Sequence, residues 1–130
     1  MPQELTFFRG EIIPSSEAKV NVMTHALHYG TAVFEGIRGN WNERTGKVVI
    51  FRLKEHYERL LRGCNILRID LPYSADDLCK ITTDLLERNG YREDVYIRPL
   101  AFKGEQLVAN LNLKTVEDEF TIVIVPFGSY

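Results

Sequence analysis

A dense group of polar and aromatic residues between His25 and Arg38 is the part of this sequence best suited to chemistry. From Val33 onward the residue types favour a strand, in which alternate side chains share a face, so Phe34, Gly36 and Arg38 are expected to point the same way. The glycine leaves room for close approach, and an aromatic ring beside a guanidinium suits a planar anionic ligand. The alternative is a bulged edge strand with ordinary surface charges.

Two further arginines lie at positions of predicted elements where their side chains have to be considered. Arg59 lies near the edge of the apolar stripe of a predicted helix, and Arg98 lies two residues after Tyr96 on a predicted strand, so Tyr96 and Arg98 share a face. A guanidinium offers a planar fork of N–H donors to a phosphate or a carboxylate. By position alone, an arginine such as Arg59 is most often a solvated helix residue, and the alternative for Tyr96 and Arg98 is a surface pair.

Three segments together resemble the N-terminal domain of the branched-chain amino-acid aminotransferases, which are pyridoxal-phosphate enzymes of fold type IV. The segments are HALHYGTAVFEGIR at 25–38, FRLKEHYERL at 51–60 and YIRPL at 96–100. Relatives that act on D-amino acids or aminodeoxychorismate tend to carry a Phe-Gly-Asp-Gly type sequence in the first segment, so its absence favours the branched-chain group. The alternatives are a D-amino-acid or amine transaminase of the same fold, or a non-catalytic α+β ligand-binding or dimerisation module.

The resemblance implies a role for each candidate residue. Arg59 would bind the phosphate of pyridoxal phosphate. The substrate pocket would be formed by Phe34, Tyr96, Arg98, Tyr29, Gly36 and Arg38. The implied activity transfers the amino group between leucine, isoleucine or valine and 2-oxoglutarate, so small amino acids and 2-oxo acids are the expected partners. His25, His28 and His56 are expected to be structural, and no metal is implied.

The Schiff-base lysine is not assigned to any residue of this chain, because in the family it lies in a C-terminal domain. We expect all six lysines to be solvated, in turns or on polar helix faces: Lys19, Lys47, Lys54, Lys80, Lys103 and Lys114. Residues 1–126 are predicted to form the small N-terminal domain and 127–130 the start of the interdomain linker, with the catalytic lysine beyond Tyr130. The 130 residues alone are expected to be inactive and not to hold pyridoxal phosphate stably.

The resemblance also implies protein partners. The C-terminal domain of the same chain would complete the site, and a homodimer or higher homo-oligomer is expected. The segment Gln106–Asn110 matches by position a family loop that closes the pocket of the neighbouring subunit. Its apolar pair Leu107 and Val108, on a long predicted loop, fits burial against a partner.

The composition is that of an ordinary globular domain. The chain has 130 residues, of which 45% are hydrophobic and 26% charged. A formal net charge of -2 gives no electrostatic case for nucleic-acid binding, and the apolar runs are too short for a membrane span. The first residues lack the pattern of a signal peptide, so a cytoplasmic location is expected, and Cys64 and Cys79 are expected to be reduced core residues.

Periodicity and turn residues predict the elements that must position these side chains. Strands are expected at 5–8, 11–13, 32–39, 48–51, 95–102 and 120–125, the last buried on both faces. Helices are expected at 54–67 and between Ser74, which forms a capping box with Asp77, and Asn89-Gly90. A long functional loop is expected at 104–119. The predicted fold is an α+β two-layer sandwich, a mainly antiparallel sheet with helices packed on one side.

Overall fold

The structure, a computed structural model, describes residues 4–105, 111–113 and 115–128. Within these residues, antiparallel strands form a seven-stranded sheet in the order β2-β1-β7-β6-β4-β5, with β3 paired to β6. The strands are β1 (Leu5–Phe8), β2 (Glu11–Pro14), β3 (Ala32–Phe34), β4 (Ile37–Asn42), β5 (Lys47–Ile50), β6 (Val95–Lys103) and β7 (Asp118–Pro126). The helices are the 3-10 turn η1 (Ser15–Glu17), α1 (His25–Tyr29), α2 (Leu53–Ile66) and α3 (Ala75–Asn89).

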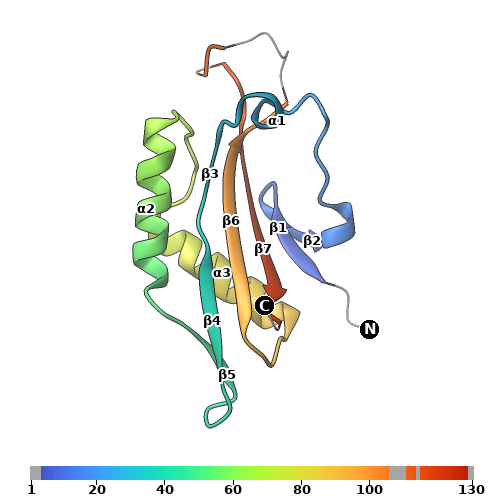
Figure 1. The fold of residues 1–130 in the computed structure, drawn as a ribbon, viewed down its shortest axis with the longest axis vertical. Helices are drawn as coiled ribbons and strands as arrows, with labels where there is room; N and C mark the ends of the chain where they lie inside the picture. Colours follow the sequence, from blue (N-terminus) through green and yellow to red (C-terminus); the bar gives the residue numbers. More distant parts are fainter. Residues whose placement is uncertain (1–3, 106–110, 114, 129–130) are drawn as a thin grey trace.

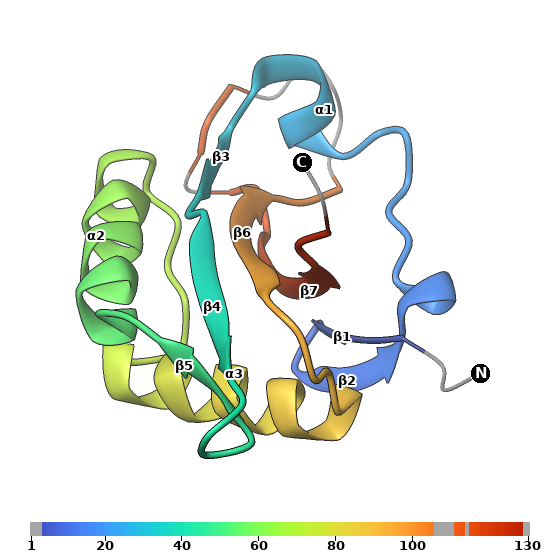
Figure 2. The same ribbon diagram turned by 60° about the horizontal axis from the view of Figure 1, so that its bottom comes forward.

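The two long helices cover one face of the sheet, as Figures 1 and 2 show. Their apolar stripes meet the inward side chains of the strands in a continuous core, and this confirms the predicted α+β sandwich. The most buried core residues are Ile37, Tyr57, Leu60, Cys64, Leu78, Leu85, Val95, Ile97, Ile122 and Ile124. Among the residues described, no helix is long and apolar enough to cross a membrane.

Local signals placed the ends of several elements correctly. Arg9 and Gly10 both have positive φ, 50° and 82°, as a two-residue hairpin turn between β1 and β2 requires. At the start of α3, the Asp77 N–H donates to the Ser74 hydroxyl at 3.0 Å, and the Ser74 N–H donates to the Asp77 carboxylate at 2.9 Å. Gly90 ends this helix in the left-handed conformation. The predicted hairpin and capping box are therefore confirmed.

The predicted strand 32–39 is wrong in one respect, because Glu35 and Gly36 interrupt it between β3 and β4. Both halves pair with β6, and the gap lies opposite Pro99. The Glu35 N–H donates to the Pro99 carbonyl at 3.1 Å. Proline has no N–H with which to return the bond, so the ladder stops at this point.

Two other features differ from the sequence predictions. Helix α1 was not predicted; it is short and ends at Gly30, whose φ is 67°. Strand β7 was predicted to be buried on both faces, but on the side away from the long helices Val123 and Val125 are only half-buried. That side of the sheet carries the candidate site, and α2 and α3 lie on the other side.

Helix α2 approaches β3 unusually closely at Gly63. A Cβ atom added to this glycine would lie 2.7 Å from Cγ1 of Val33, which is shorter than an ordinary van der Waals contact. Val33 is β-branched and has little rotamer freedom with which to move away. The glycine therefore sets the distance between this helix and the edge of the sheet.

We predict that Gly63→Ala lowers the free energy of unfolding by about 1–3 kcal/mol through overpacking. Helix propensity acts in the opposite direction, since alanine favours a helix interior by roughly 1 kcal/mol over glycine. Urea unfolding of the protein measures the net effect. In a Val33→Ala background the penalty should shrink or reverse, and an equal penalty in both backgrounds would contradict the close contact.

Candidate functional site

Five of the predicted pocket residues lie together on the sheet face that α2 and α3 leave open. Alternation along β3 and β4 turns Glu35 and Ile37 inward, where both are buried, and turns their neighbours outward. The ring of Phe34 is 54% exposed on this face. The outward group comprises Phe34, Gly36 and Arg38 with Tyr96 and Arg98 of the adjoining strand β6.

Arg98 is held between two aromatic side chains. Its guanidinium carbon lies 4.1 Å from the ring centroid of Phe34, and its Nη2 donates to the Tyr96 hydroxyl at 2.5 Å. Its Nε is buried and, within the described residues, lacks a hydrogen-bond partner. A buried N–H without an acceptor is unfavourable, and a ligand carboxylate would reach this atom only if the neighbouring side chains moved. The side chain is thus fixed in place and incompletely satisfied.

Gly36 makes room for this arrangement. A Cβ atom at position 36 would lie 2.7 Å from the Tyr96 hydroxyl. The space that the sequence suggested for a ligand is therefore used first by Tyr96, whose hydroxyl accepts the Arg98 bond. Any side chain at position 36 would displace that hydroxyl.

Arg38 stands at the rim of the group. Its Nη2 donates to Asp94 at 3.2 Å and its Nε to Asn40 at 2.9 Å. Its guanidinium also stacks on Phe127, at 4.6 Å from the ring centroid, and Phe127 meets the Tyr96 ring edge-on at 6.0 Å. The sequence assigned Phe127 to a linker, so its contact with the group was missed. The domain boundary itself stays a prediction.

Arg59 comes from the helical layer and meets the sheet at the gap between β3 and β4. Its Nε and Nη2 donate to the two carboxylate oxygens of Glu35 at 2.8 and 2.7 Å, and Nδ1 of His56 lies 2.8 Å from the same carboxylate. The Glu35 side chain is only 6% exposed. Burial alone would raise the pKa of Glu35, but the hydrogen bonds from Arg59 and His56 outweigh it and hold the pKa below its usual value.

This pairing leaves Arg59 able to bind an anion. It uses one edge of the guanidinium and leaves Nη1 outside the pair. The Arg59 side chain is 65% exposed, so a phosphate can approach the remaining N–H groups. A ligand held by Arg59 at one end and by Arg98 at the other would lie across the β3–β4 gap.

The structure places the remaining predicted pocket residue separately, in α1. The ring of Tyr29 packs on His25, with centroids 4.6 Å apart, and Tyr29 is 43% exposed. His25 itself is buried, and its Nδ1 lies 2.9 Å from the Thr31 hydroxyl, which fits a structural role. The segment Gln106–Asn110 lies outside the described residues.

The expectation that all lysines are solvated is wrong for Lys103. This residue ends β6 and is only 1% exposed, because its ammonium finds three hydrogen-bond acceptors in the interior. Lys114 lies outside the described residues. The other lysines, Lys19, Lys47, Lys54 and Lys80, are exposed as expected.

Sequence reasoning also missed Glu35, although a signal was present. In the predicted strand, the side chain of Glu35 lies on the face opposite to Phe34 and Gly36. That face must pack against the helices. A carboxylate there requires a positive partner, and Arg59 at the edge of the apolar stripe of α2 was the obvious candidate. Combining the two patterns would have predicted the pair.

The structure shows no other site type in its described part. There, no group of three or more His, Cys, Asp or Glu residues is arranged to hold a metal ion. Cys64 and Cys79 are both unpaired; the first is buried, and the second is partly buried against the core.

The chain belongs to the amino-transferase class IV family, whose model matches residues 32–129. It is 47% identical over 128 residues to the probable branched-chain-amino-acid aminotransferase of Aquifex aeolicus, covering 98% of this chain and 40% of that protein. The fold matches the branched-chain aminotransferase of Thermoproteus uzoniensis, solved with norvaline, at a TM-score of 0.89 and 37% identity, over 99% of this chain and 42% of that one.

A third relative carries a ligand that bears on the site. The T.th. branched-chain amino acid aminotransferase, solved with N-(5'-phosphopyridoxyl)-L-glutamate, matches at a TM-score of 0.87 and 36% identity, over 100% of this chain and 42% of that one. The chain thus spans about two fifths of the length of the relatives it matches.

We predict that Glu35→Gln lowers stability near neutral pH and that the loss disappears in acid. Because the folded-state pKa of Glu35 is lowered, the charged carboxylate stabilises the fold above its ordinary pKa of about 4.3, and this contribution is lost as the pH falls through the folded-state value. Urea unfolding at about pH 7 and about pH 3 measures the difference. Glu58→Gln, at an exposed position of α2, is the control. A Glu35→Gln deficit that does not change with pH would contradict the assignment.

Proposed function

We propose that this chain is the N-terminal part of a branched-chain amino-acid aminotransferase, which transfers the amino group between leucine, isoleucine or valine and 2-oxoglutarate. The observation that carries the proposal is the presence of two arginines at the β3–β4 gap, each of which could donate to an anion. Arg59 is exposed beside Glu35, and Arg98 is fixed on Phe34 with its Nη2 bound to the Tyr96 hydroxyl. The names of the relatives support the same activity.

Pyridoxal phosphate is the proposed cofactor, and the residues present fit its phosphate. When bound, this cofactor supplies an electron sink that stabilises negative charge on the substrate carbon. Arg59 would hold the phosphate with the guanidinium edge that Glu35 leaves free, and Glu35 would keep the fork in a fixed orientation. The phosphopyridoxyl ligand of the third relative supports this choice.

The proposed substrate pocket combines an apolar wall with one charged group. Phe34 and the ring of Tyr96 would receive the side chain of a branched-chain amino acid. Arg98 would donate to the side-chain carboxylate of glutamate or 2-oxoglutarate when that substrate binds instead. Norvaline and a glutamate derivative, bound by two of the relatives, represent these two kinds of side chain.

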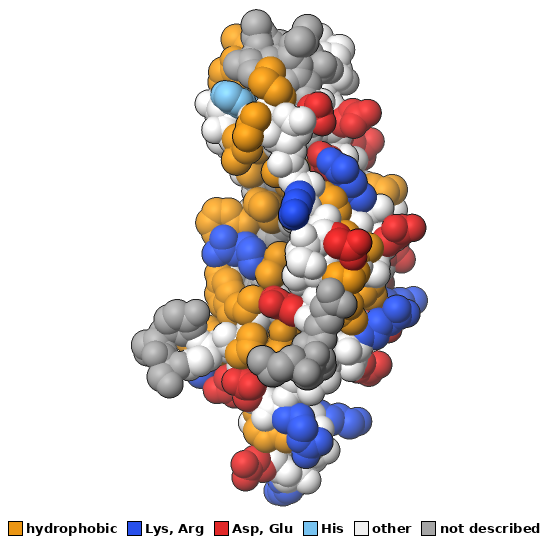
Figure 3. All heavy atoms as spheres, turned by 90° about the vertical axis from the view of Figure 1, so that its right-hand side faces the viewer, with side chains coloured by type: hydrophobic (Ala, Val, Ile, Leu, Met, Phe, Trp, Pro, Cys, Tyr) orange, Lys and Arg blue, Asp and Glu red, His pale blue; other side chains and the backbone are white. Residues whose placement is uncertain are grey.

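We also propose that the complete enzyme assembles as a homodimer or higher homo-oligomer and that a C-terminal domain supplies the catalytic lysine. Exposed apolar residues gather near α1, around a groove of about 490 Å³ lined by Phe8, Leu27, Leu100, Phe102 and Val123. In Figure 3, hydrophobic side chains are visible near the top of the molecule, which is the end where α1 lies in Figure 1. An apolar surface of this kind favours burial against another protein surface. The cytoplasmic location expected from the sequence remains part of this proposal.

In the complete protein, Arg59→Ala should raise the dissociation constant for pyridoxal phosphate by about tenfold or more, because the phosphate loses its charged partner. The dissociation constant of Arg59→Lys should lie between those of the wild type and Arg59→Ala, since lysine keeps the charge but not the planar fork of N–H donors. Titration of cofactor into the apo protein measures both. Arg62→Ala, an exposed position one turn further along α2, is the matched control. Unchanged affinity, or an equal loss in the control, would refute the assignment of Arg59.

Arg98→Met should change the choice of amino donor. We expect kcat/KM to fall about tenfold more with glutamate than with leucine, because only glutamate carries a side-chain carboxylate that needs the guanidinium. Steady-state kinetics with the two donors measure the ratio. Arg92→Met, at an exposed position before β6, should leave the ratio unchanged. Equal losses for both donors would rule out the proposed role.

A further inference from the structure

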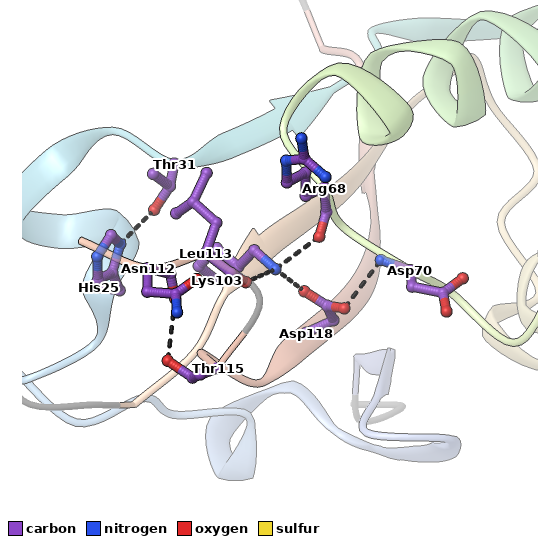
Figure 4. Close-up of polar contacts among 9 residues, drawn as sticks. All are labelled: His25, Thr31, Arg68, Asp70, Lys103, Asn112, Leu113, Thr115 and Asp118. Atoms are coloured by element: carbon purple, nitrogen blue, oxygen red, sulfur yellow. Dashed lines mark hydrogen bonds and ion pairs between the residues drawn. The ribbon is translucent and has the colours of Figure 1, made fainter. Parts of the chain in front are cut away.

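Lys103 is buried within the described structure, and the proposed reaction makes no use of it. Its Nζ donates to the carbonyls of Arg68 and Leu113, both at 2.7 Å, and to a carboxylate oxygen of Asp118 at 2.5 Å. Figure 4 shows the ammonium between these three acceptors. An ammonium has three N–H donors, so all of them are used. The charge is buried without an unmet hydrogen bond, which is the condition for tolerating it in an interior.

The acceptors attach the end of α2 to the sheet. Arg68 lies just past the C-terminal end of α2 in the left-handed conformation, with φ 57°. Its carbonyl receives the ammonium, and the partial negative charge of a helix C-terminus also favours a cation there. The second carboxylate oxygen of Asp118 accepts from the N–H of Asp70 at 2.8 Å. Lys103 at the end of β6 and Asp118 at the start of β7 therefore bind the segment after α2 at two residues, Arg68 and Asp70.

This attachment is the last of three contacts along one side of α2. In order along the helix, they join Arg59 to Glu35, Gly63 to Val33 and the Arg68 carbonyl to Lys103. The N–H of Lys103 also donates to the carbonyl of Thr31, just before β3. All three contacts therefore fix α2 against β3 or the segment of β6 beside it. The Lys103 contact determines where the C-terminal end of the helix lies.

We propose that Lys103 is a positioning residue whose buried ammonium fixes α2 along β3 and β6 and so holds Arg59 at a constant distance from Arg98. The consequence for cofactor binding rests on the proposed function, whereas the attachment of α2 does not. Arg59 lies on helix α2 and Arg98 on strand β6. They can bind one ligand together only if the helix and the sheet keep their relative position. A displacement of about 1 Å at such a group is enough to reduce activity strongly.

The first test compares Lys103→Met with Lys80→Met in the complete protein. Lys80 is exposed on α3, so its substitution removes the same charge without touching the attachment. In Lys103→Met, hydrogen exchange at the amides of residues 66–70 should rise by about tenfold or more, because the carbonyls and Asp118 lose their common partner. The dissociation constant for pyridoxal phosphate should rise severalfold. Neither quantity should change in Lys80→Met.

A second variant separates positioning from overall stability. Lys103→Met combined with Asp118→Leu removes the unpaired carboxylate, and apolar replacement of a buried ion pair restores stability in other proteins. The double variant should recover much of its resistance to urea, while faster exchange at 66–69 and the loss of cofactor affinity persist; residue 70 is left out because its N–H donates to Asp118. Wild-type exchange in Lys103→Met, or cofactor affinity that recovers together with stability, would overturn the proposal. If the wild type binds no pyridoxal phosphate, the proposed function fails. The exchange data alone then show whether Lys103 attaches the end of α2 to the sheet.

Discussion

Pro99 is the residue on which the geometry of the site depends. A proline inside a strand cannot donate to its neighbour, and in β6 the missing N–H faces the point where β3 gives way to β4. The chain there keeps one bond, from the Glu35 N–H to the Pro99 carbonyl. On either side of the interruption, Glu35 reaches inward to Arg59 and Gly36 leaves space outward for Tyr96. The two halves of the candidate site therefore lie on opposite faces of the chain at this interruption, as strand alternation requires.

Two buried charges of opposite sign fix the helix that brings Arg59 to this gap. Glu35 is a carboxylate with donors on both of its oxygens, and Lys103 is an ammonium with three acceptors. Apolar packing between α2 and the sheet is non-directional and would tolerate small shifts of the helix along its axis. Hydrogen bonds to buried charges do not tolerate such shifts, because an unpaired buried charge is strongly unfavourable. The two charges thus add a fixed position to an interface whose stability comes from hydrophobic burial.

The sequence predicted the elements well where the signal was local. Periodicity identified α2 and α3, turn residues identified the first hairpin, and alternation correctly grouped Phe34 with Gly36 and Arg38 on one face. The interruption at Glu35 was missed because it depends on Pro99, which is distant in sequence and comes opposite only once the register is set. The burial of Lys103 was missed for the same reason, since its three acceptors come from separate segments of the chain.

The surroundings of Arg98 suit the proposed pocket, which would have to accept both apolar and anionic side chains. A bare guanidinium beside a bound leucine would be strongly unfavourable, because it would lose water without gaining an acceptor. Here the ring of Phe34 covers its face and the Tyr96 hydroxyl already accepts one bond, and within the described structure Nε is enclosed without a partner. An apolar substrate would pack against the rings, and a carboxylate would gain a charged partner that is already oriented. In the proposed function, the aromatic residues around Arg98 would therefore allow one side chain to serve two kinds of substrate.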